Sequence, residues 1–186
     1  MNLKSVFAAL AVGVACSQAL AAGAGPYVGI GAGTTRFDAD CSGTSACDNS
    51  DTGYKIVGGY KFDESISAEL TYFDLGKATA TYLGIDAEIK TTAIGLGMAF
   101  RGNFGSAWSG VARLGLASVN TDIDVRYGPH AGSDSERTAK VYAGLGLAYA
   151  VTSALKIEAA WDFTQTEYED QKGRVDLLSI GLLYDF

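Results

Sequence analysis

The chain has 186 residues, a formal net charge of −7, 24 glycines and only 2 prolines. This length suits a single domain, and the acidic balance excludes nucleic acid as a partner, because no basic stripe is present to neutralise phosphates. Although 48% of the residues are hydrophobic, no stretch after residue 21 reaches the roughly 20 apolar residues that a transmembrane helix needs.

Residues 1–21 predict a secretory signal peptide. Lys4 provides the positive start, residues 6–15 form a short apolar run, and residues 19–21 (Ala-Leu-Ala) match the small-x-small pattern of a cleavage site. We therefore expect one mature domain that spans residues 22–186.

The cysteines bear on processing and on covalent structure. Cys16 leaves a lipoprotein open as an alternative, although the Gly-Val-Ala before it lacks the leucine that is usual in that motif. Cys41 and Cys47 lie six positions apart in a polar stretch, and export to an oxidising periplasm allows them to pair. We expect a loop disulfide between them. Two free thiols or a metal site would be the alternative, with no histidine nearby to add a ligand.

Eight segments alternate bulky apolar residues with small or polar ones, and this period of two predicts β-strands. In chain order they are residues 27–35, 53–62, 66–73, 92–100, 108–117, 141–149, 155–163 and 178–186. In the fourth segment, for example, Ile94 and Leu96 alternate with Gly95 and Gly97.

This distribution of residue sizes indicates what surrounds the strands. A soluble barrel crowds large apolar residues inside, whereas small residues facing a narrow lumen and bulky ones facing lipid are typical of a membrane barrel. Backbone groups in hydrocarbon have no water to bond, so such a sheet must close on itself. We predict an all-β fold, an eight-stranded antiparallel transmembrane β-barrel. A soluble lipocalin-type barrel is the alternative.

The connections between these segments alternate in length. Those at residues 63–65, 101–107 and 151–154 are short, and those at residues 38–52, 76–88, 120–137 and 166–174 are longer and polar. Short periplasmic turns and longer extracellular loops are the rule for membrane barrels, so we expect both termini in the periplasm. This orientation sorts the aromatic residues into a periplasmic girdle (Tyr60, Phe62, Phe100, Trp108, Tyr149, Tyr184 and Phe186) and an outer girdle (Tyr54, Tyr72, Trp161 and Phe163).

Four motifs give the mature chain a resemblance to the OmpA-type transmembrane barrel and its relatives among the small outer-membrane β-barrel proteins. They are GPYVGIGAG, TGYKIVGGYKF, ISAELTYFDLGK and VDLLSIGLLYDF. The resemblance implies an integral protein of the Gram-negative outer membrane, in contact with its lipids and lipopolysaccharide. The chain differs from full-length OmpA proteins in lacking their peptidoglycan-binding domain, so a cell-wall tether is not expected.

The last residues resemble the signal by which the barrel-assembly machinery recognises such proteins. This signal ends in phenylalanine with alternating apolar residues before it, and the matching residues here are Ile180, Leu182, Tyr184 and Phe186. The resemblance therefore implies the assembly machinery as a partner during biogenesis.

Charged residues on the small-residue faces are the candidate lumen site. Glu69 and Arg113 fall at similar depth, and Glu158, Lys61 and Lys156 are able to join them. They resemble the salt-bridge network that plugs the lumen of OmpA-like barrels. Pairing is expected because a buried charge without a partner costs several kcal/mol. A gate or narrow conducting path is the alternative.

The sequence gives little support for catalysis. Some small outer-membrane barrels modify lipid A, chemistry that needs a histidine near a hydroxyl group at the membrane rim. The single histidine, His130, falls instead in a polar loop tip, and the spacing of the acidic loop residues matches no calcium-loop template. We expect no catalytic residue, cofactor or metal.

We expect a structural or surface-interaction role, in which the acidic extracellular loops meet an extracellular ligand. A small channel with a charge-gated lumen is the first alternative, and a lipid-modifying enzyme is the second.

Overall fold

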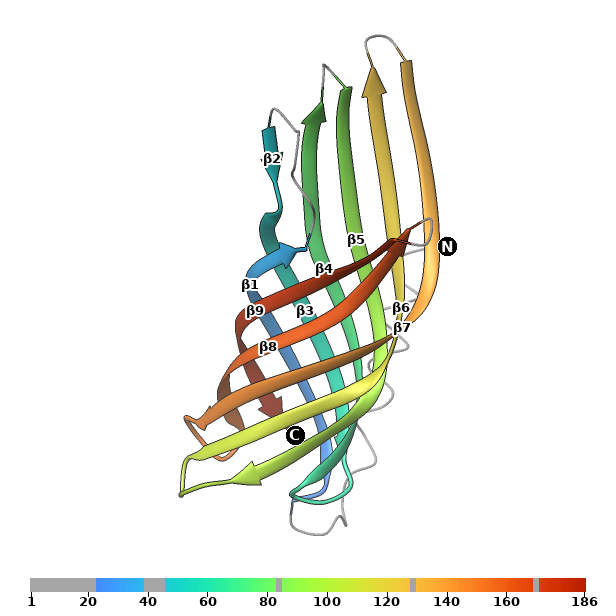
Figure 1. The fold of residues 1–186 in the computed structure, drawn as a ribbon. Helices are drawn as coiled ribbons and strands as arrows, with labels where there is room; N and C mark the ends of the chain where they lie inside the picture. Colours follow the sequence, from blue (N-terminus) through green and yellow to red (C-terminus); the bar gives the residue numbers. More distant parts are fainter. Residues whose placement is uncertain (1–22, 39–45, 83–84, 128–129, 169–170) are drawn as a thin grey trace, which may run out of the picture.

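A computed structural model describes residues 23–38, 46–82, 85–127, 130–168 and 171–186, which form an antiparallel sheet (Figure 1). No helix in these ranges is long and apolar enough to cross a membrane. The strands are β1 (Gly25–Phe37), β2 (Ala46–Asp48), β3 (Ser50–Lys61), β4 (Ile66–Tyr82), β5 (Ile85–Asn103), β6 (Trp108–Tyr127), β7 (His130–Ala150), β8 (Leu155–Tyr168) and β9 (Gln171–Asp185).

The sheet closes into a barrel of eight strands. Strands β3, β1, β9, β8, β7, β6, β5 and β4 pair in that order, and β4 pairs back onto β3. The short β2 is an addition that pairs with β4 outside this ring. The two ends of the described chain meet where β1 lies beside β9, with Tyr27 opposite Asp185. The predicted eight-stranded antiparallel barrel is confirmed.

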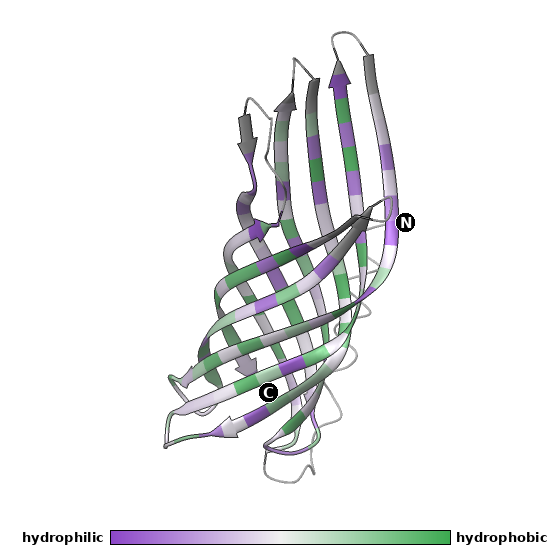
Figure 2. Cartoon of the chain, viewed as in Figure 1, coloured by the Kyte–Doolittle hydropathy of each residue, from purple (hydrophilic) through white to green (hydrophobic). Residues whose placement is uncertain are grey.

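The alternation of inward and outward residues also follows the prediction. Ile180 is 66% exposed on the outside, whereas its neighbour Ser179 is 5% exposed inside the barrel. The same contrast separates Leu70, at 57%, from Glu69, at 1%. In Figure 2 the hydrophobic and hydrophilic residues accordingly alternate along the strands of the barrel.

The strands are longer than predicted, and most of the four polar connections are not loops. β5 and β6 pair without interruption from Ile85 opposite Tyr127 to Asn103 opposite Ser109. The prediction was wrong because it took polar composition as a sign of loops, although an antiparallel ladder pairs backbone groups whatever the side chains are. Arg101, assigned to a turn, therefore lies within β5.

The two ends of the barrel differ. One end, here called the turn end, carries the short connections 62–65, 104–107 and 151–154 and both ends of the described chain. At the other end the strands part: β7 and β8 stop pairing at Tyr142 and Thr164, and β3 and β4 stop at Tyr54 and Asp74. Beyond these points β2 and the outer parts of β4, β5, β6 and β7 continue as one sheet, here called the projecting sheet (Figure 1).

A bulge marks the start of the projecting sheet on β4. The register between β4 and β5 shifts between Asp74 and Lys77. Gly76 lies within this bulge with a φ of 74°, in the left-handed region that glycine adopts without strain. The bulge redirects β4 as it leaves the barrel wall.

Candidate functional site

Inward-facing charges meet at the middle of the lumen. Arg113 on β6 donates from Nε to Oε2 of Glu69 on β4 at 2.7 Å, and from Nη2 to Oε2 of Glu158 on β8 at 2.9 Å. Arg101 on β5 donates from Nη2 to the other oxygen of Glu69, at 2.9 Å. β6 and β8 are not neighbours of β4 in the sheet, so these side chains meet across the lumen.

A further ion pair extends this group. Lys55 on β3 lies 2.7 Å from Oδ2 of Asp162 and 3.7 Å from Oε1 of Glu158, both on β8. Together the six side chains form what we call the central charge cluster: Lys55, Glu69, Arg101, Arg113, Glu158 and Asp162. Their side chains are between 0 and 9% exposed. Three cations balance three carboxylates, so the cluster carries no formal net charge.

Lys61 and Lys156 do not bond to the central charge cluster, contrary to the sequence-based hypothesis. Both lie nearer the turn end and share one carboxylate, Oδ2 of Asp185, at 2.6 and 2.9 Å. Tyr27 stands between the two groups. Its hydroxyl donates to Glu69 and accepts from Arg101, while its ring lies 5.5 Å from the Lys61 nitrogen.

Three members of the cluster were missing from the sequence-based network. Lys55 and Asp162 lie on the inward faces of their strands, as the alternation predicts. Only the register of the strands shows that they lie at the same depth in the lumen as the rest of the cluster. Arg101 continues the inward series Ala93, Gly95, Gly97 and Ala99 by period two. Assigning it to a turn removed it from consideration.

Apolar side chains fill the lumen between the central charge cluster and the projecting sheet. This apolar plug consists of Phe37, Phe73, Leu75, Ala93, Ala117, Val119, Tyr142, Val175 and Leu177. The Phe73 and Tyr142 rings meet edge to face, with centroids 5.9 Å apart. The cavity beside them measures about 10 Å³, which is room for at most one water molecule. The lumen is therefore closed by two successive layers, one ionic and one apolar.

On β4, β5 and β6 the projecting sheet reverses the polarity of the barrel wall. On its inward face Ala78, Ile89 and Ile123 lie in one row across β4, β5 and β6. Its outward face carries charged residues such as Glu88, which lies opposite Asp124. An apolar outward face suits lipid and a charged one suits water, so this reversal marks where the apolar belt of the barrel ends.

Other predicted site residues fall at the surface or outside the described part. Ile180, Leu182, Tyr184 and Phe186 all face outward and are 66, 46, 47 and 63% exposed. Cys41 lies outside the described residues, as does the side chain of Cys47, so the disulfide stays a prediction. The side chain of His130 is also outside them.

Comparison with known proteins identifies the fold family. A family model described as the outer membrane protein beta-barrel domain matches residues 7–186. The chain belongs to this outer-membrane β-barrel family. No curated protein sequence matches it significantly. As a member of the family, the protein is an integral protein of the bacterial outer membrane, and its outward apolar faces contact lipid.

Solved structures of other outer-membrane β-barrels share the fold. Neisserial surface protein A is 20% identical and superposes with a TM-score of 0.64, covering 88% of this chain and 99% of its own. Ail, the attachment invasion locus protein of Yersinia pestis, is 17% identical with a TM-score of 0.62 and the same coverage. OprG of Pseudomonas aeruginosa is 16% identical with a TM-score of 0.55, covering 88% and 97%. At these identities the likeness shows the fold alone.

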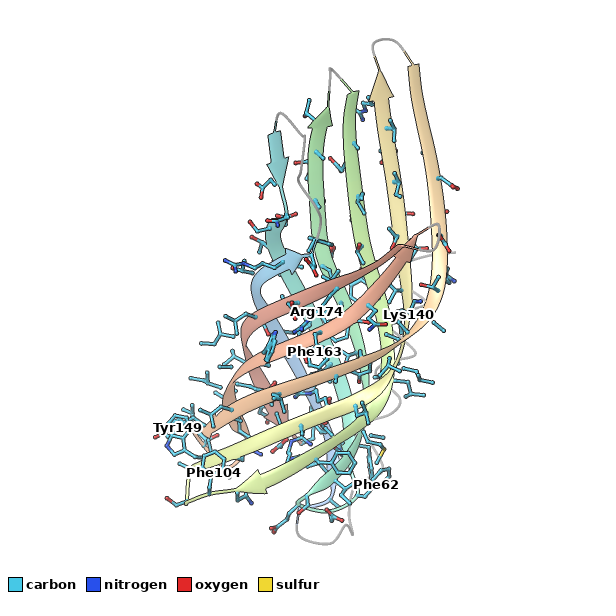
Figure 3. All side chains as sticks on the ribbon, in the orientation of Figure 1. Phe62, Phe104, Lys140, Tyr149, Phe163 and Arg174 are labelled. Carbon is cyan, nitrogen blue, oxygen red and sulfur yellow. The ribbon has the colours of Figure 1, made fainter. Side chains whose placement is uncertain are left out.

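Aromatic side chains border the outward apolar surface of this outer-membrane barrel. At the turn end the rings of Trp108 and Tyr149 lie 4.9 Å apart, and those of Tyr184 and Phe186 lie 5.1 Å apart. Towards the projecting sheet Arg174 lies over Phe163, with 5.0 Å between its guanidinium and the ring centre. Figure 3 labels Tyr149 at the turn end and Phe163 with Arg174 further along the barrel. Aromatic rings at both borders are typical of membrane barrels.

Proposed function

We propose that this protein has a sealed lumen and acts at the cell surface, where its projecting sheet binds a partner that carries positive charge. In this orientation the turn end and both termini face the periplasm, because short turns lie on that side in membrane barrels. The projecting sheet then stands outside the cell.

The closed lumen is the observation that carries this proposal. The central charge cluster and the apolar plug follow each other along the lumen, so a solute would have to displace both ion pairs and packed apolar side chains. The surfaces outside the membrane then carry the function of the protein. In Figure 1 the projecting sheet extends well beyond the barrel on this side.

The charge of the projecting sheet indicates which kind of partner binds to it. Acidic residues outnumber basic ones in the segments on this side of the barrel. Glu88, Asp122 and Asp124 face outward on β5 and β6, where Lys77 pairs with Glu88 and Lys90 lies opposite Asp122. Ail has been solved in complex with the heparin analogue sucrose octasulfate, a polyanion. The acidic balance of these segments instead favours a polycation, because complementary charge promotes encounter and suppresses wrong partners.

Binding of poly-lysine and heparin to the mature protein in nanodiscs tests this proposal. We expect poly-lysine to bind, with affinity that falls as salt rises, and heparin not to bind. The triple variant Glu88→Gln, Asp122→Asn, Asp124→Asn should bind poly-lysine more weakly. The control Asp63→Asn, Glu64→Gln removes charge at the turn end and should not. Equal poly-lysine binding by the triple variant and wild type would contradict the proposal.

A small channel is the second candidate, and one observation favours it. Nη1 of Arg113, the hydroxyl of Tyr142 and Oδ1 of Asp162 are buried without a hydrogen-bond partner in the described structure. Buried polar atoms of this kind usually bind water, and a water chain could conduct ions. Planar-bilayer recordings decide between the candidates: steady conductance by wild type would support the channel, and a silent wild type would support the sealed barrel.

Biogenesis and covalent structure add further proposals. We propose that residues 1–21 are removed on export, and that Cys41 and Cys47 then form a disulfide. The assembly machinery would read the outward row that ends at Phe186, and lipopolysaccharide would surround the outward faces nearest the projecting sheet. Mass measurement of the purified protein after alkylation without reductant tests both the cleavage site and the disulfide.

A further inference from the structure

The projecting sheet has an apolar inward face along β4, β5 and β6. Two rows of side chains cross these strands, and we call them the inner apolar face: Ala78, Ile89 and Ile123 in the row nearer the barrel, and Ala80, Ala87 and Val125 in the row beyond it. Ile89 and Val125 are 36 and 39% exposed. Ala78 also packs against the apolar plug. The inner apolar face therefore continues the apolar filling of the lumen out of the barrel, to where it is open to solvent.

The strands on the opposite side of the barrel end before the projecting sheet does. β8 and β9 form a hairpin that ends at Tyr168 opposite Gln171, and in Figure 1 the outer parts of β5, β6 and β7 rise beyond this hairpin. An open space therefore lies in front of the inner apolar face on the side away from the membrane. Contiguous apolar surface with a polar border is a mark of an interaction site.

The border of the inner apolar face on β7 is acidic. Asp134 lies opposite Ile123 and Glu136 lies opposite Thr121, so both carboxylates are on the inward side of the sheet. Lys140 follows on the same side, opposite Ala117 and at the level of the apolar plug. The part of β7 that flanks the apolar rows thus carries two negative charges. A ligand that matches this face has an apolar surface with basic groups along one side.

We propose that the inner apolar face binds a basic amphipathic helix of an extracellular peptide or protein. Three strands about 4.8 Å apart make the apolar rows roughly 10 Å wide, which is close to the diameter of an α-helix. The apolar side of such a helix packs on the rows, and its basic residues reach Asp134 and Glu136, as in other helix-in-groove complexes. This inference rests on the proposed function, because it requires the projecting sheet to lie outside the cell.

The position of this face argues against two other occupants. Membrane lipid contacts the outward side of the barrel, whereas the inner apolar face points towards the lumen axis and lies beyond the apolar belt. A second copy in the same membrane stands beside the first barrel, so its own projecting sheet rises along a separate axis and does not reach this space. A peptide from the extracellular medium can enter the space from its open side.

A synthetic helix tests the inference with the mature protein in nanodiscs. The probe is a blocked peptide of about 14 residues with leucines on one side of the helix and lysines on the other. A second peptide has the same residues reordered so that no apolar side forms. Empty nanodiscs measure binding to lipid alone, and the excess over them is binding to the protein. We expect the amphipathic peptide to show this excess and to bind about tenfold or more tightly than the reordered one.

Isoleucine methyl signals locate the bound peptide. The signals of Ile89 and Ile123 should shift when the amphipathic peptide is added, because both side chains lie in the inner apolar face. Ile94 is the control, since it lies on the outward side of β5 and is 55% exposed to lipid. Its signal should stay in place. Shifts confined to Ile94 would place the peptide in the lipid and overturn the inference.

Protein variants separate the apolar and the ionic contribution. Ile89→Thr, Ile123→Thr keeps the β-branched shape but removes apolar surface, and should weaken peptide binding by about tenfold. Asp134→Asn, Glu136→Gln should also weaken it, with the larger effect at low salt. The control Asp63→Asn, Glu64→Gln removes the same number of charges at the turn end and should leave binding unchanged.

The outcomes distinguish this inference from the proposed function. Poly-lysine binding without binding of the amphipathic peptide would overturn the inference alone. Peptide binding without poly-lysine binding would contradict the polycation partner alone. Equal peptide binding by wild type and Ile89→Thr, Ile123→Thr would also overturn the inference. Self-association of the protein that the amphipathic peptide abolishes would assign this face to a second copy and overturn it as well.

Discussion

Tyr27 and Tyr142 occupy the lumen at positions where nearby strands carry glycine. A Cβ atom added to Gly59 would lie 2.3 Å from Cζ of Tyr27, and one added to Gly115 would lie 2.5 Å from Cε1 of Tyr142. Both rings are almost fully buried. The small residues on the inner face therefore make room for packed tyrosines, and they do not line an open pore.

Gly58 and Gly59 allow a test of this packing at neighbouring positions. Gly59→Ala should lower the free energy of unfolding by about 1–3 kcal/mol, because the added methyl group overpacks the lumen against Tyr27. Gly58→Ala is the control, since a Cβ there meets nothing within 4 Å. Denaturant unfolding in lipid vesicles measures both. A Gly58→Ala loss as large as that of Gly59→Ala would contradict the packing argument.

The bond between Glu69 and Arg113 should appear as a coupling energy. Glu69→Gln or Arg113→Met alone should cost about 3–5 kcal/mol, because each leaves buried charges without a partner. The double variant should recover part of that loss, although Arg101 then loses its ion pair with Glu69 and Glu158 loses its ion pair with Arg113. A double-mutant cycle of unfolding free energies measures the coupling.

An exposed ion pair provides the control for this cycle. Lys77 and Glu88 lie 3.1 Å apart, but their side chains are 52 and 41% exposed. Lys77→Met with Glu88→Gln should therefore show a coupling of about 1 kcal/mol or less. Coupling of equal size in the two cycles would show that burial does not strengthen the lumen pair.

Individual strands show where the lipid-facing surface ends. The outward residues of β6 change from Leu114 and Leu116 to Ser118 and Asn120, while its pairing with β5 continues beyond them to Tyr127. Side-chain chemistry thus sets the border of the membrane, whereas the backbone ladder sets the length of the strand. This separation explains why the prediction from side-chain polarity placed the strand ends wrongly.

Arginine substitutions along β6 test the position of this border. Leu114→Arg should cost about 2–4 kcal/mol of folding stability in lipid vesicles, because the charge would lie near the middle of the hydrocarbon. Ser118→Arg places the same side chain outward on the same strand, nearer the projecting sheet, and should cost about 1 kcal/mol or less. Equal costs at the two positions would contradict the assigned border.

For the whole molecule, closure depends on the pairing of the first and last barrel strands. β1 and β9 are in register from Tyr27 opposite Asp185 to Phe37 opposite Val175. This contact joins the first and last strands of the described chain, so it carries the largest loop-closure entropy of the fold. Assembly therefore needs β9 to be presented correctly, which is the role we propose for its outward row.

Phe186→Ala tests that role against a matched rim aromatic. Both Phe186 and Phe104 are exposed at the turn end, at 63 and 57%. Replacing either by alanine should change the free energy of unfolding by about 1 kcal/mol or less, since neither is in the core. Phe186→Ala alone should lower the yield of folded barrel in cells, measured by heat-dependent electrophoretic mobility. Equal yields for the two variants would refute the assembly signal.

The class of fold, the number of barrel strands and the inward-facing residues follow from the amino-acid pattern alone. A period of two assigns every side chain to one of two faces, and the choice of bulky or small residues shows which face meets lipid. Glu69 and Arg113 could be named as facing inward for this reason alone.

The folded chain is needed to show which inward charges meet and which strands continue beyond the barrel. Alternation fixes the face of a residue but not its height relative to other strands, which depends on register and on strand tilt. Lys61 and Lys156 therefore joined Asp185, while Lys55, Arg101 and Asp162 completed the cluster around Glu69. The point at which β8 stops pairing with β7 is likewise a property of the closed sheet and of no single strand.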